Sequence, residues 1–105
     1  MPKLNLEADY RAQVQAILKH WAPQYEVWAY GSRVNGTCHE ASDLDLVLRD
    51  PNTLKKPIET LSRLKQAFKE SDLPIIVDLI DWATLPDSFR IEIEKQYIVI
   101  QPKPC

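Results

Sequence analysis

Glycine and cysteine are scarce in this sequence: the 105 residues include only two of each, and a single methionine. Cys38 and Cys105 show neither the ligand spacing of a zinc site nor a disulfide framework, so we expect both to be free thiols. Both glycines, Gly31 and Gly36, fall in one short segment, YGSRVNG. Glycine tolerates backbone conformations that other residues avoid, so this segment is the first candidate for a turn with such a conformation.

Long apolar runs are also missing. No segment approaches the roughly 20 apolar residues that a membrane-spanning helix needs. The beginning of the chain, MPKLNLEADYRAQ, is interrupted by Glu7, Asp9 and Arg11, so it lacks the continuous apolar stretch of a signal peptide. We therefore expect a cytoplasmic protein with no membrane partner.

A large excess of charge of either sign is absent. Thirteen basic and fifteen acidic residues give a net charge of -2, which disfavours strong general binding to nucleic acid and leaves a local basic pocket open. With 45% hydrophobic and 27% charged residues, the composition is ordinary for a globular protein. We expect one domain over residues 1–105 with a modest core.

Hydrophobic periodicity predicts a mixture of helices and strands. Apolar residues from Leu6 to Trp21 recur at spacings of three and four, and Pro23 ends this helix. Strands are expected at 25–30, 43–48, 75–80 and, as a short terminal run, 97–100, with further helices at 58–68 and 84–96. This order favours an α/β (α+β) fold, a small mixed sheet with helices packed on it. We expect the first two strands to be antiparallel neighbours and the apolar run at 75–80 to be an inner strand.

Two carboxylates stand two residues apart in the second strand. Asp43 and Asp45 share one parity, whereas Leu44, Leu46 and Leu48 share the other, so the acids face away from the leucines. Same-face residues of this spacing have α-carbons about 7 Å apart and can converge on one or two divalent cations. The alternative is a solvated strand face.

A third acid, Asp78, interrupts the apolar run IIVDLI. Carboxylates in such segments are rarely buried without a partner or a metal, so three acids would meet if this strand lay beside that of Asp43 and Asp45. The alternative is a strand-end residue bonded to backbone amides. Asp81 has the opposite parity, and we expect it to cap a turn.

Three carboxylates that meet in one place would suit chemistry at phosphorus. Two divalent ions held by shared carboxylates promote in-line attack on a phosphate, and magnesium is the natural choice for oxygen ligands. Gly31, Ser32 and Arg33 offer a close backbone approach, a hydroxyl and a cation for a triphosphate. The alternatives are a plain Gly-Ser turn and a surface salt bridge of Arg33. We expect His39 to be exposed and not a metal ligand, because no ligand spacing surrounds it.

The spaced pattern of Gly31-Ser32, ten residues, then Asp43-Leu44-Asp45 resembles the signature of the DNA polymerase beta-like nucleotidyltransferase superfamily. It would arise by chance in roughly one of two thousand chains of this composition. The strings GSRVNG, SDLDLVL and IIVDLIDW, with LP before the last helix, are similar to the minimal nucleotidyltransferase (MNT) family over about residues 6–100. One departure is Gln96-Tyr97, where a glycine commonly follows the last helix in that family.

The resemblance implies the polymerase beta-like fold and specific roles for the motif residues. Gly31 and Ser32 would bind the nucleotide phosphates, Asp43 and Asp45 would bind magnesium, and Asp78 would be the third carboxylate that helps to activate the acceptor hydroxyl.

Minimal members of the family resemble the antitoxin halves of toxin–antitoxin pairs, in which the partner is a helical HEPN ribonuclease. This implies transfer of AMP from ATP, with two magnesium ions, to a tyrosine hydroxyl of the toxin. Two alternatives stay open: an antitoxin that neutralises by binding alone with a vestigial nucleotide site, and a nucleotidyltransferase that acts on a small hydroxylated molecule. The base preference, the number of nucleotides added and a homodimer are open as well.

Overall fold

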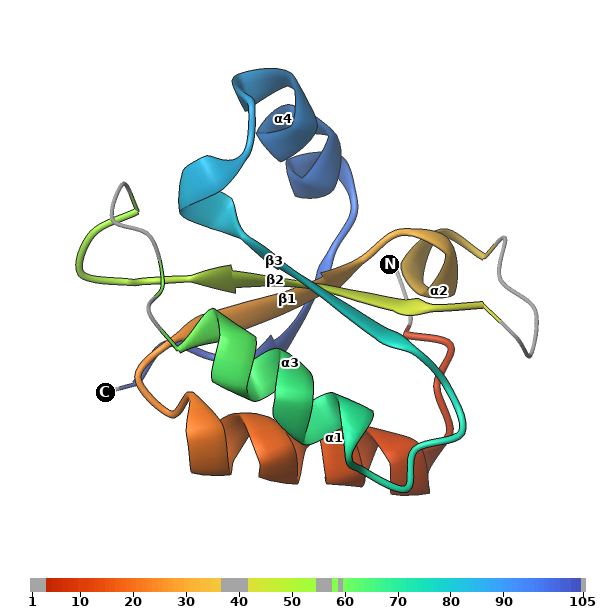
Figure 1. Ribbon diagram of the computed structural model, residues 1–105. Coiled ribbons are helices and arrows are strands. Elements are labelled where there is room, and N and C mark those ends of the chain that lie inside the picture. Colours follow the sequence, from red (N-terminus) through yellow and green to blue (C-terminus); the bar gives the residue numbers. More distant parts are fainter. Residues whose placement is uncertain (1–3, 37–41, 55–57, 59, 105) are drawn as a thin grey trace.

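The computed structural model describes residues 4–36, 42–54, 58 and 60–104. Its four strands form one mixed sheet in the order β3-β2-β1-β4, in which β1 is antiparallel to β2 and β4, and β2 is parallel to β3 (Figure 1). The sheet and its helices confirm the expected fold class and the antiparallel pairing of the first two strands. The elements in chain order are α1 (Ala8–Trp21), β1 (Glu26–Tyr30), α2 (Ser32–Asn35), β2 (Leu44–Arg49), α3 (Leu61–Lys69), β3 (Val77–Asp81), the 3-10 turn η1 (Trp82–Thr84), α4 (Asp87–Lys95) and β4 (Ile98–Gln101).

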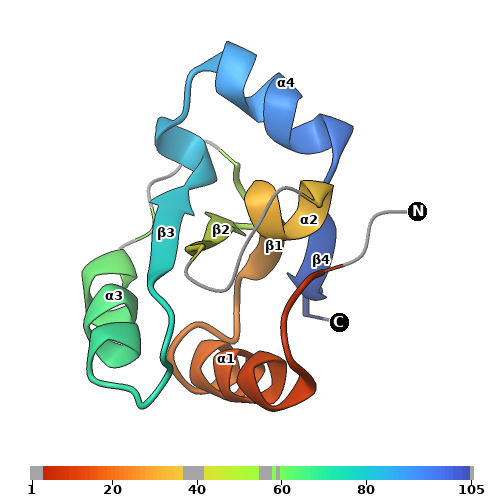
Figure 2. The same ribbon diagram turned by 90° about the vertical axis from the view of Figure 1, so that its right-hand side faces the viewer.

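One face of the sheet is covered by α1 and α3, and α4 lies on the other side (Figures 1 and 2). The covered face carries the main core. The three leucines of β2 point into it and are completely buried, together with Leu18 of α1 and Leu64 of α3. The alternation of leucine and acid in the sequence thus separates the core face of β2 from its opposite face.

The opposite face holds a smaller aromatic cluster under η1 and α4. Trp28 of β1 and Trp82 of η1 are buried here, so both tryptophans belong to the core. Tyr97 stacks on Trp28 with ring centroids 3.8 Å apart, and the Arg49 guanidinium lies 3.9 Å from the Trp28 ring centroid. Arg49 also pairs with Glu26 at 2.6 Å, which keeps this partly buried cation neutralised. The cluster anchors α4 to the sheet.

The prediction of an inner strand at 75–80 is wrong, because β3 lies at the edge of the sheet and pairs with β2 alone in the described chain. The apolar run has another cause. Ile75, Val77 and Leu79 pack on the core face, whereas Ile76 on the other parity is 68% exposed. A strand that is buried on one face and also borders the aromatic cluster at Ile80 can be apolar without being central.

Two helix expectations also need correction. The second long helix begins at Leu61 and not at residue 58; Ile58 is buried ahead of it, and its N–H donates to the Asp81 carboxylate at 2.7 Å. Trp21, placed on the apolar stripe of the first helix, is 37% exposed at the end of α1, where it packs edge-on against His20. Within the described ranges, no helix combines the length and apolar character that crossing a lipid bilayer requires.

We expect Leu46→Ala to lower the free energy of unfolding by about 3 kcal/mol, because it opens a cavity in the main core. Urea denaturation followed by circular dichroism measures this. Ile76→Ala removes a side chain that is mostly in solvent and should stay within about 0.5 kcal/mol of wild type. Equal losses for the two variants would contradict the assignment of the core to the face of α1 and α3.

Candidate active site

The turn from β1 into α2 is built on both glycines. Gly31 precedes α2 with φ +80° and ψ -153°, a conformation that is essentially restricted to glycine, and Gly36 ends α2 in the left-handed region at φ +86°. The carbonyl of Gly31 accepts hydrogen bonds from the N–H groups of Val34 and Asn35, both at 3.0 Å. A short helical turn therefore begins at Ser32.

Gly31 also lies directly against an acid of the predicted site. A Cβ atom at Gly31 would collide with the carboxylate of Asp45, and nothing lies within 4 Å of the corresponding position at Gly36. A side chain at this position would force the Asp45 carboxylate to move from where it lies, whereas glycine lets the backbone pass this close. The Gly-Ser segment and Asp45 of β2 are therefore neighbours in one place.

Strand pairing brings the predicted acids together. Asp45 lies opposite Tyr30 in the antiparallel pair and opposite Asp78 in the parallel pair, so the three side chains form one row across β1, β2 and β3 on the same face. Asp43 comes one residue before β2 begins. Asp43 and Asp78 are exposed, and Asp45 is half-buried. The condition for three acids to meet, that β3 lies beside β2, is fulfilled.

The row is electrostatically strained. Burial, and then the neighbouring charges of Asp78 and Asp43, raise the pKa of Asp45 above its ordinary value. Burial, and then the charges of Asp45 and Asp78, raise the pKa of the Tyr30 hydroxyl well above its ordinary value, so Tyr30 is neutral at physiological pH. Mutual repulsion of carboxylates is what a bound divalent cation would relieve.

Among the residues that the structure describes, no three Asp, Glu, His or Cys side chains stand as a ready-made metal site. The fit of this place to a cation rests on the backbone register of Asp45 and Asp78 and on the repulsion between the acids. Asp81 is different: it is buried, and its carboxylate accepts hydrogen bonds from Ala83 N–H at 3.0 Å and Ile58 N–H at 2.7 Å. It caps η1, as expected for a turn residue.

Arg33, a predicted phosphate contact, is bonded to neighbouring backbone in the structure. Its side chain is only 7% exposed, and its guanidinium donates to the Ser42 carbonyl at 3.1 and 2.9 Å and to the Asn5 carbonyl at 2.8 Å. These bonds hold α2 against the segment that leads into β2 and against the start of the chain. The motif arginine therefore acts on the architecture of the site, because its donors are directed at backbone carbonyls.

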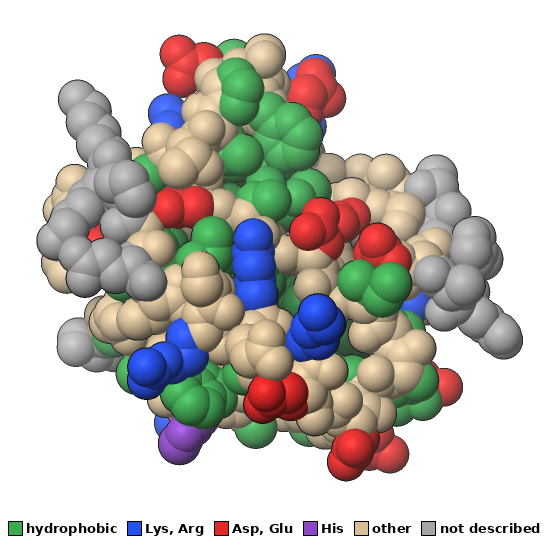
Figure 3. Space-filling view, viewed as in Figure 1, with side chains coloured by type: hydrophobic (Ala, Val, Ile, Leu, Met, Phe, Trp, Pro, Cys, Tyr) green, Lys and Arg blue, Asp and Glu red, His purple; other side chains and the backbone are tan. Residues whose placement is uncertain are grey.

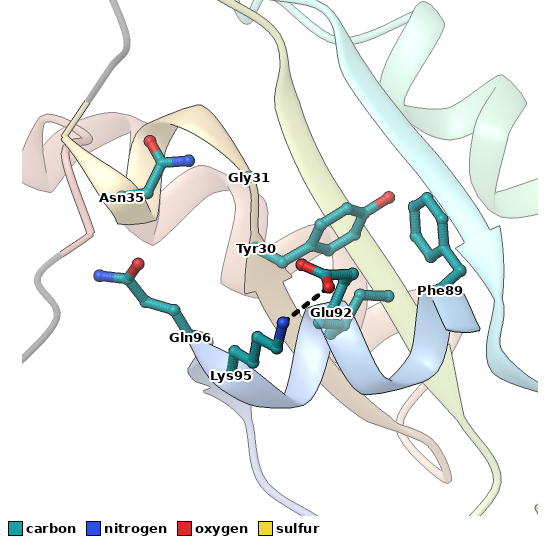
Figure 4. Close-up of a pocket in the computed structure, with 8 residues that line it drawn as sticks. Tyr30, Gly31, Asn35, Phe89, Glu92, Lys95 and Gln96 are labelled. Carbon is teal, nitrogen blue, oxygen red and sulfur yellow. Dashed lines mark hydrogen bonds and ion pairs between the residues drawn. The ribbon is translucent and has the colours of Figure 1, made fainter. Parts of the chain in front are cut away.

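A pocket of about 310 Å³ opens beside Gly31, between α2 and α4 (Figure 4). No sequence motif singles out the α4 residues that line this pocket, because they reach the turn only through the packing of α4 on the aromatic cluster. Tyr30 is the one lining side chain that the sequence points to, since it directly precedes Gly31. The pocket is lined by Tyr30, Gly31, Asn35, Phe89, Glu92, Ile93, Lys95 and Gln96.

The surroundings of the site combine acidic and apolar character. Figure 3 shows acidic side chains to the right of centre, directly below a group of hydrophobic side chains that lies under α4. Within the pocket, Phe89 is 41% exposed and packs edge-on against Tyr30 with centroids 6.0 Å apart. Cys38, His39 and Cys105 lie outside the described residues, so the expectations for them stay predictions.

Substituting each glycine by alanine should distinguish the cost of a strained backbone conformation from the cost of a collision with Asp45. Gly36→Ala meets open space, so we expect it to lower the free energy of unfolding by about 1 kcal/mol through its positive φ alone. Gly31→Ala adds the collision with Asp45 to its strained backbone, and we expect about 2 kcal/mol or more. Thermal and urea unfolding measure both; a smaller loss for Gly31→Ala than for Gly36→Ala would refute the contact.

Removing the charge of Asp45 should stabilise the metal-free protein. A raised pKa means that the folded chain holds this proton more tightly than the unfolded chain, so wild type loses stability as pH rises from about 3.8 through the raised value. With a metal chelator at pH 7, Asp45→Asn should therefore unfold at higher urea concentration than wild type. The difference should shrink as the pH falls toward 3.8. A variant less stable than wild type at pH 7 would contradict the repulsion.

Comparisons with known proteins identify the family of the chain. Residues 2–96 match the family described as poly(A) RNA polymerase, mitochondrial-like, central palm domain. A relative from Haemophilus influenzae, named probable protein adenylyltransferase MntA, is 47% identical over 103 residues, which cover 96% of this chain and 87% of the relative. The solved crystal structure of a toxin-antitoxin with AMP-PNP shares the fold with a TM-score of 0.70 at 20% identity, covering 89% of this chain and 73% of that one. The chain therefore belongs to this palm-domain family and is a nucleotidyltransferase.

Proposed function

We propose that this chain is a protein adenylyltransferase that transfers AMP from ATP to a tyrosine hydroxyl of a toxin partner and thereby silences the toxin. The observation that carries the proposal is the row of Asp45 and Asp78 with the Gly31 backbone against Asp45. A phosphate held at the turn is then adjacent to the acids. The relative named as a probable protein adenylyltransferase supports transfer to a protein.

The turn at the start of α2 holds the phosphates of the nucleotide. Gly31 lets the backbone approach closely, and the Ser32 hydroxyl is a donor for a phosphate oxygen. Arg33 contributes by fixing α2 through the carbonyls of Asn5 and Ser42. The triphosphate is thus positioned by a small rigid element whose place is set before the nucleotide arrives.

Asp43 and Asp45, with Asp78, are the residues that would hold two magnesium ions. Bound magnesium would neutralise phosphate charge and lower the pKa of a coordinated hydroxyl. Burial, and then the charges of Asp78 and Asp43, raise the pKa of Asp45, and a bound cation would offset the part that comes from its two acidic neighbours. Carboxylate oxygens are also the ligands that magnesium prefers.

The transfer step follows from this arrangement. The acceptor hydroxyl oxygen forms a bond to the α-phosphorus of ATP, while the bond from that phosphorus to the bridging oxygen of the β-phosphate breaks. Pyrophosphate leaves with the electron pair, and Asp78, exposed at the sheet edge, accepts the hydroxyl proton. Tyr30 stays neutral in the same row and does not compete as a nucleophile.

A HEPN-type ribonuclease toxin is the partner that the sequence resemblance implies. The solved neighbour is described as a toxin-antitoxin with AMP-PNP, which supports both a toxin partner and ATP as the nucleotide. The edge position of β3 and the exposure of Asp78 suit an acceptor that arrives on another protein.

We expect Asp45→Asn and Asp78→Asn each to lower the rate of AMP transfer to the toxin by roughly 100-fold or more, because each removes a charge needed in the transition state. Transfer of labelled AMP from ATP, with magnesium, measures this. Asp72→Asn, an exposed acid before β3, is the matched control and should retain wild-type transfer.

Circular dichroism must show that the variants are folded. Undiminished transfer by Asp45→Asn would refute the site. If the toxin is neutralised in cells as well by Asp45→Asn as by wild type, neutralisation by binding alone is the better interpretation. Transfer to an aminoglycoside and not to the toxin would instead favour a small hydroxylated acceptor.

A further inference from the structure

The triphosphate of ATP carries more negative charge than the turn at Gly31 can balance by itself. The nearest sequence candidate, Arg33, is unsuited to this task because its guanidinium is bonded to the carbonyls of Asn5 and Ser42 and is almost fully buried. Turning it toward a phosphate would leave those carbonyls without these bonds. Beyond the charge that magnesium would neutralise, another side chain is better placed than Arg33 to contact the phosphates.

The pocket beside Gly31 supplies one. Of its eight described lining residues, only Lys95 carries a positive charge. Lys95 belongs to the last turn of α4, and α4 is held over the turn by Ile93 and the aromatic cluster. We propose that Lys95 binds the β- and γ-phosphates of ATP in this pocket. The identity of the nucleotide rests on the function proposed above.

The partner that Lys95 has in the structure is weak enough to be displaced. Its ammonium pairs with Glu92 at 2.7 Å, and the two side chains are 65% and 68% exposed. Exposed ion pairs on one helix contribute little to stability, whereas a phosphate offers more charge and several acceptor oxygens. Glu92 therefore holds Lys95 at the pocket and competes with the nucleotide for it.

The pocket has a polar end and an apolar end (Figure 4). Asn35, Gln96 and Lys95 lie toward one end, and Phe89 lies at the other, with Tyr30 between them. The Gln96 amide donates to the Val34 carbonyl at 3.4 Å, a long bond that bridges the end of α4 to α2. The end with the amides and the ammonium adjoins Gly31 and suits phosphate. With about 310 Å³, the pocket is at the small end of ligand sites, which fits part of a nucleotide.

A purely structural role for Lys95 makes a different prediction. A cation in the last turn of a helix complements the helix dipole, so its loss could lower stability without any effect on ligand choice. The discriminating measurement is therefore the affinity for ATP relative to AMP, because AMP lacks the β- and γ-phosphates. Stability alone does not separate the two roles.

Isothermal titration calorimetry with a non-hydrolysable ATP analogue and with AMP, both with magnesium, tests the proposal on the full chain. Lys95→Ala should raise the dissociation constant of the analogue about tenfold or more and leave that of AMP unchanged. Lys95→Arg should restore most of the affinity. Glu92→Gln, which removes the competitor, should tighten the analogue about two- to fivefold.

The matched control is Lys69→Ala, which removes a lysine from the last turn of α3 on the other face of the sheet. It should bind both ligands like wild type. Wild-type affinity of Lys95→Ala for the analogue, or an equal loss for the analogue and AMP, would overturn the inference and leave the proposed function intact. If wild type binds no ATP analogue, the proposed function fails and the inference fails with it.

Discussion

The close approach of the Gly31 backbone to the Asp45 carboxylate is the constraint on which the site depends. It requires a residue without a side chain, and it requires the unusual backbone angles that begin α2 at Ser32. Because β1 and β2 are antiparallel, the end of β1 and the beginning of β2 lie side by side at the same end of the sheet. The Gly-Ser turn and the acids at the start of β2, separated by ten residues in the sequence, therefore lie together.

The two faces of β2 differ: one is packed in the core, and the other carries the acid of the candidate site. Its leucines are fully buried under α1 and α3, so they provide the free energy that keeps the strand in place. On the other face Asp45 stands between Tyr30 and Asp78, and burial, followed by the charges of Asp78 and Asp43, raises the pKa of Asp45. The fold tolerates an unfavourable arrangement of acids there because the opposite face is well packed.

The cations near the site have different surroundings. Arg33 ties α2 to neighbouring backbone, and Arg49 is enclosed by aromatic rings and paired with Glu26. Lys95 lines the pocket in an exposed, weakly held ion pair. A guanidinium satisfies several carbonyls in fixed directions, whereas an ammonium on a flexible stem changes partners readily. This difference suits arginine to the architecture and lysine to a ligand that comes and goes.

Local patterns in the sequence determined the helices and strands, the outward parity of Asp45, and the turn at Gly31, because backbone periodicity and glycine chemistry act over a few residues. The tertiary structure decided the rest. The edge position of β3 depends on which strand it pairs with, and the pairing of Asp45 with Asp78 depends on parallel register across thirty residues of chain. The burial of Arg33 and the arrival of α4 at the turn are likewise products of packing between distant segments, which no local pattern encodes.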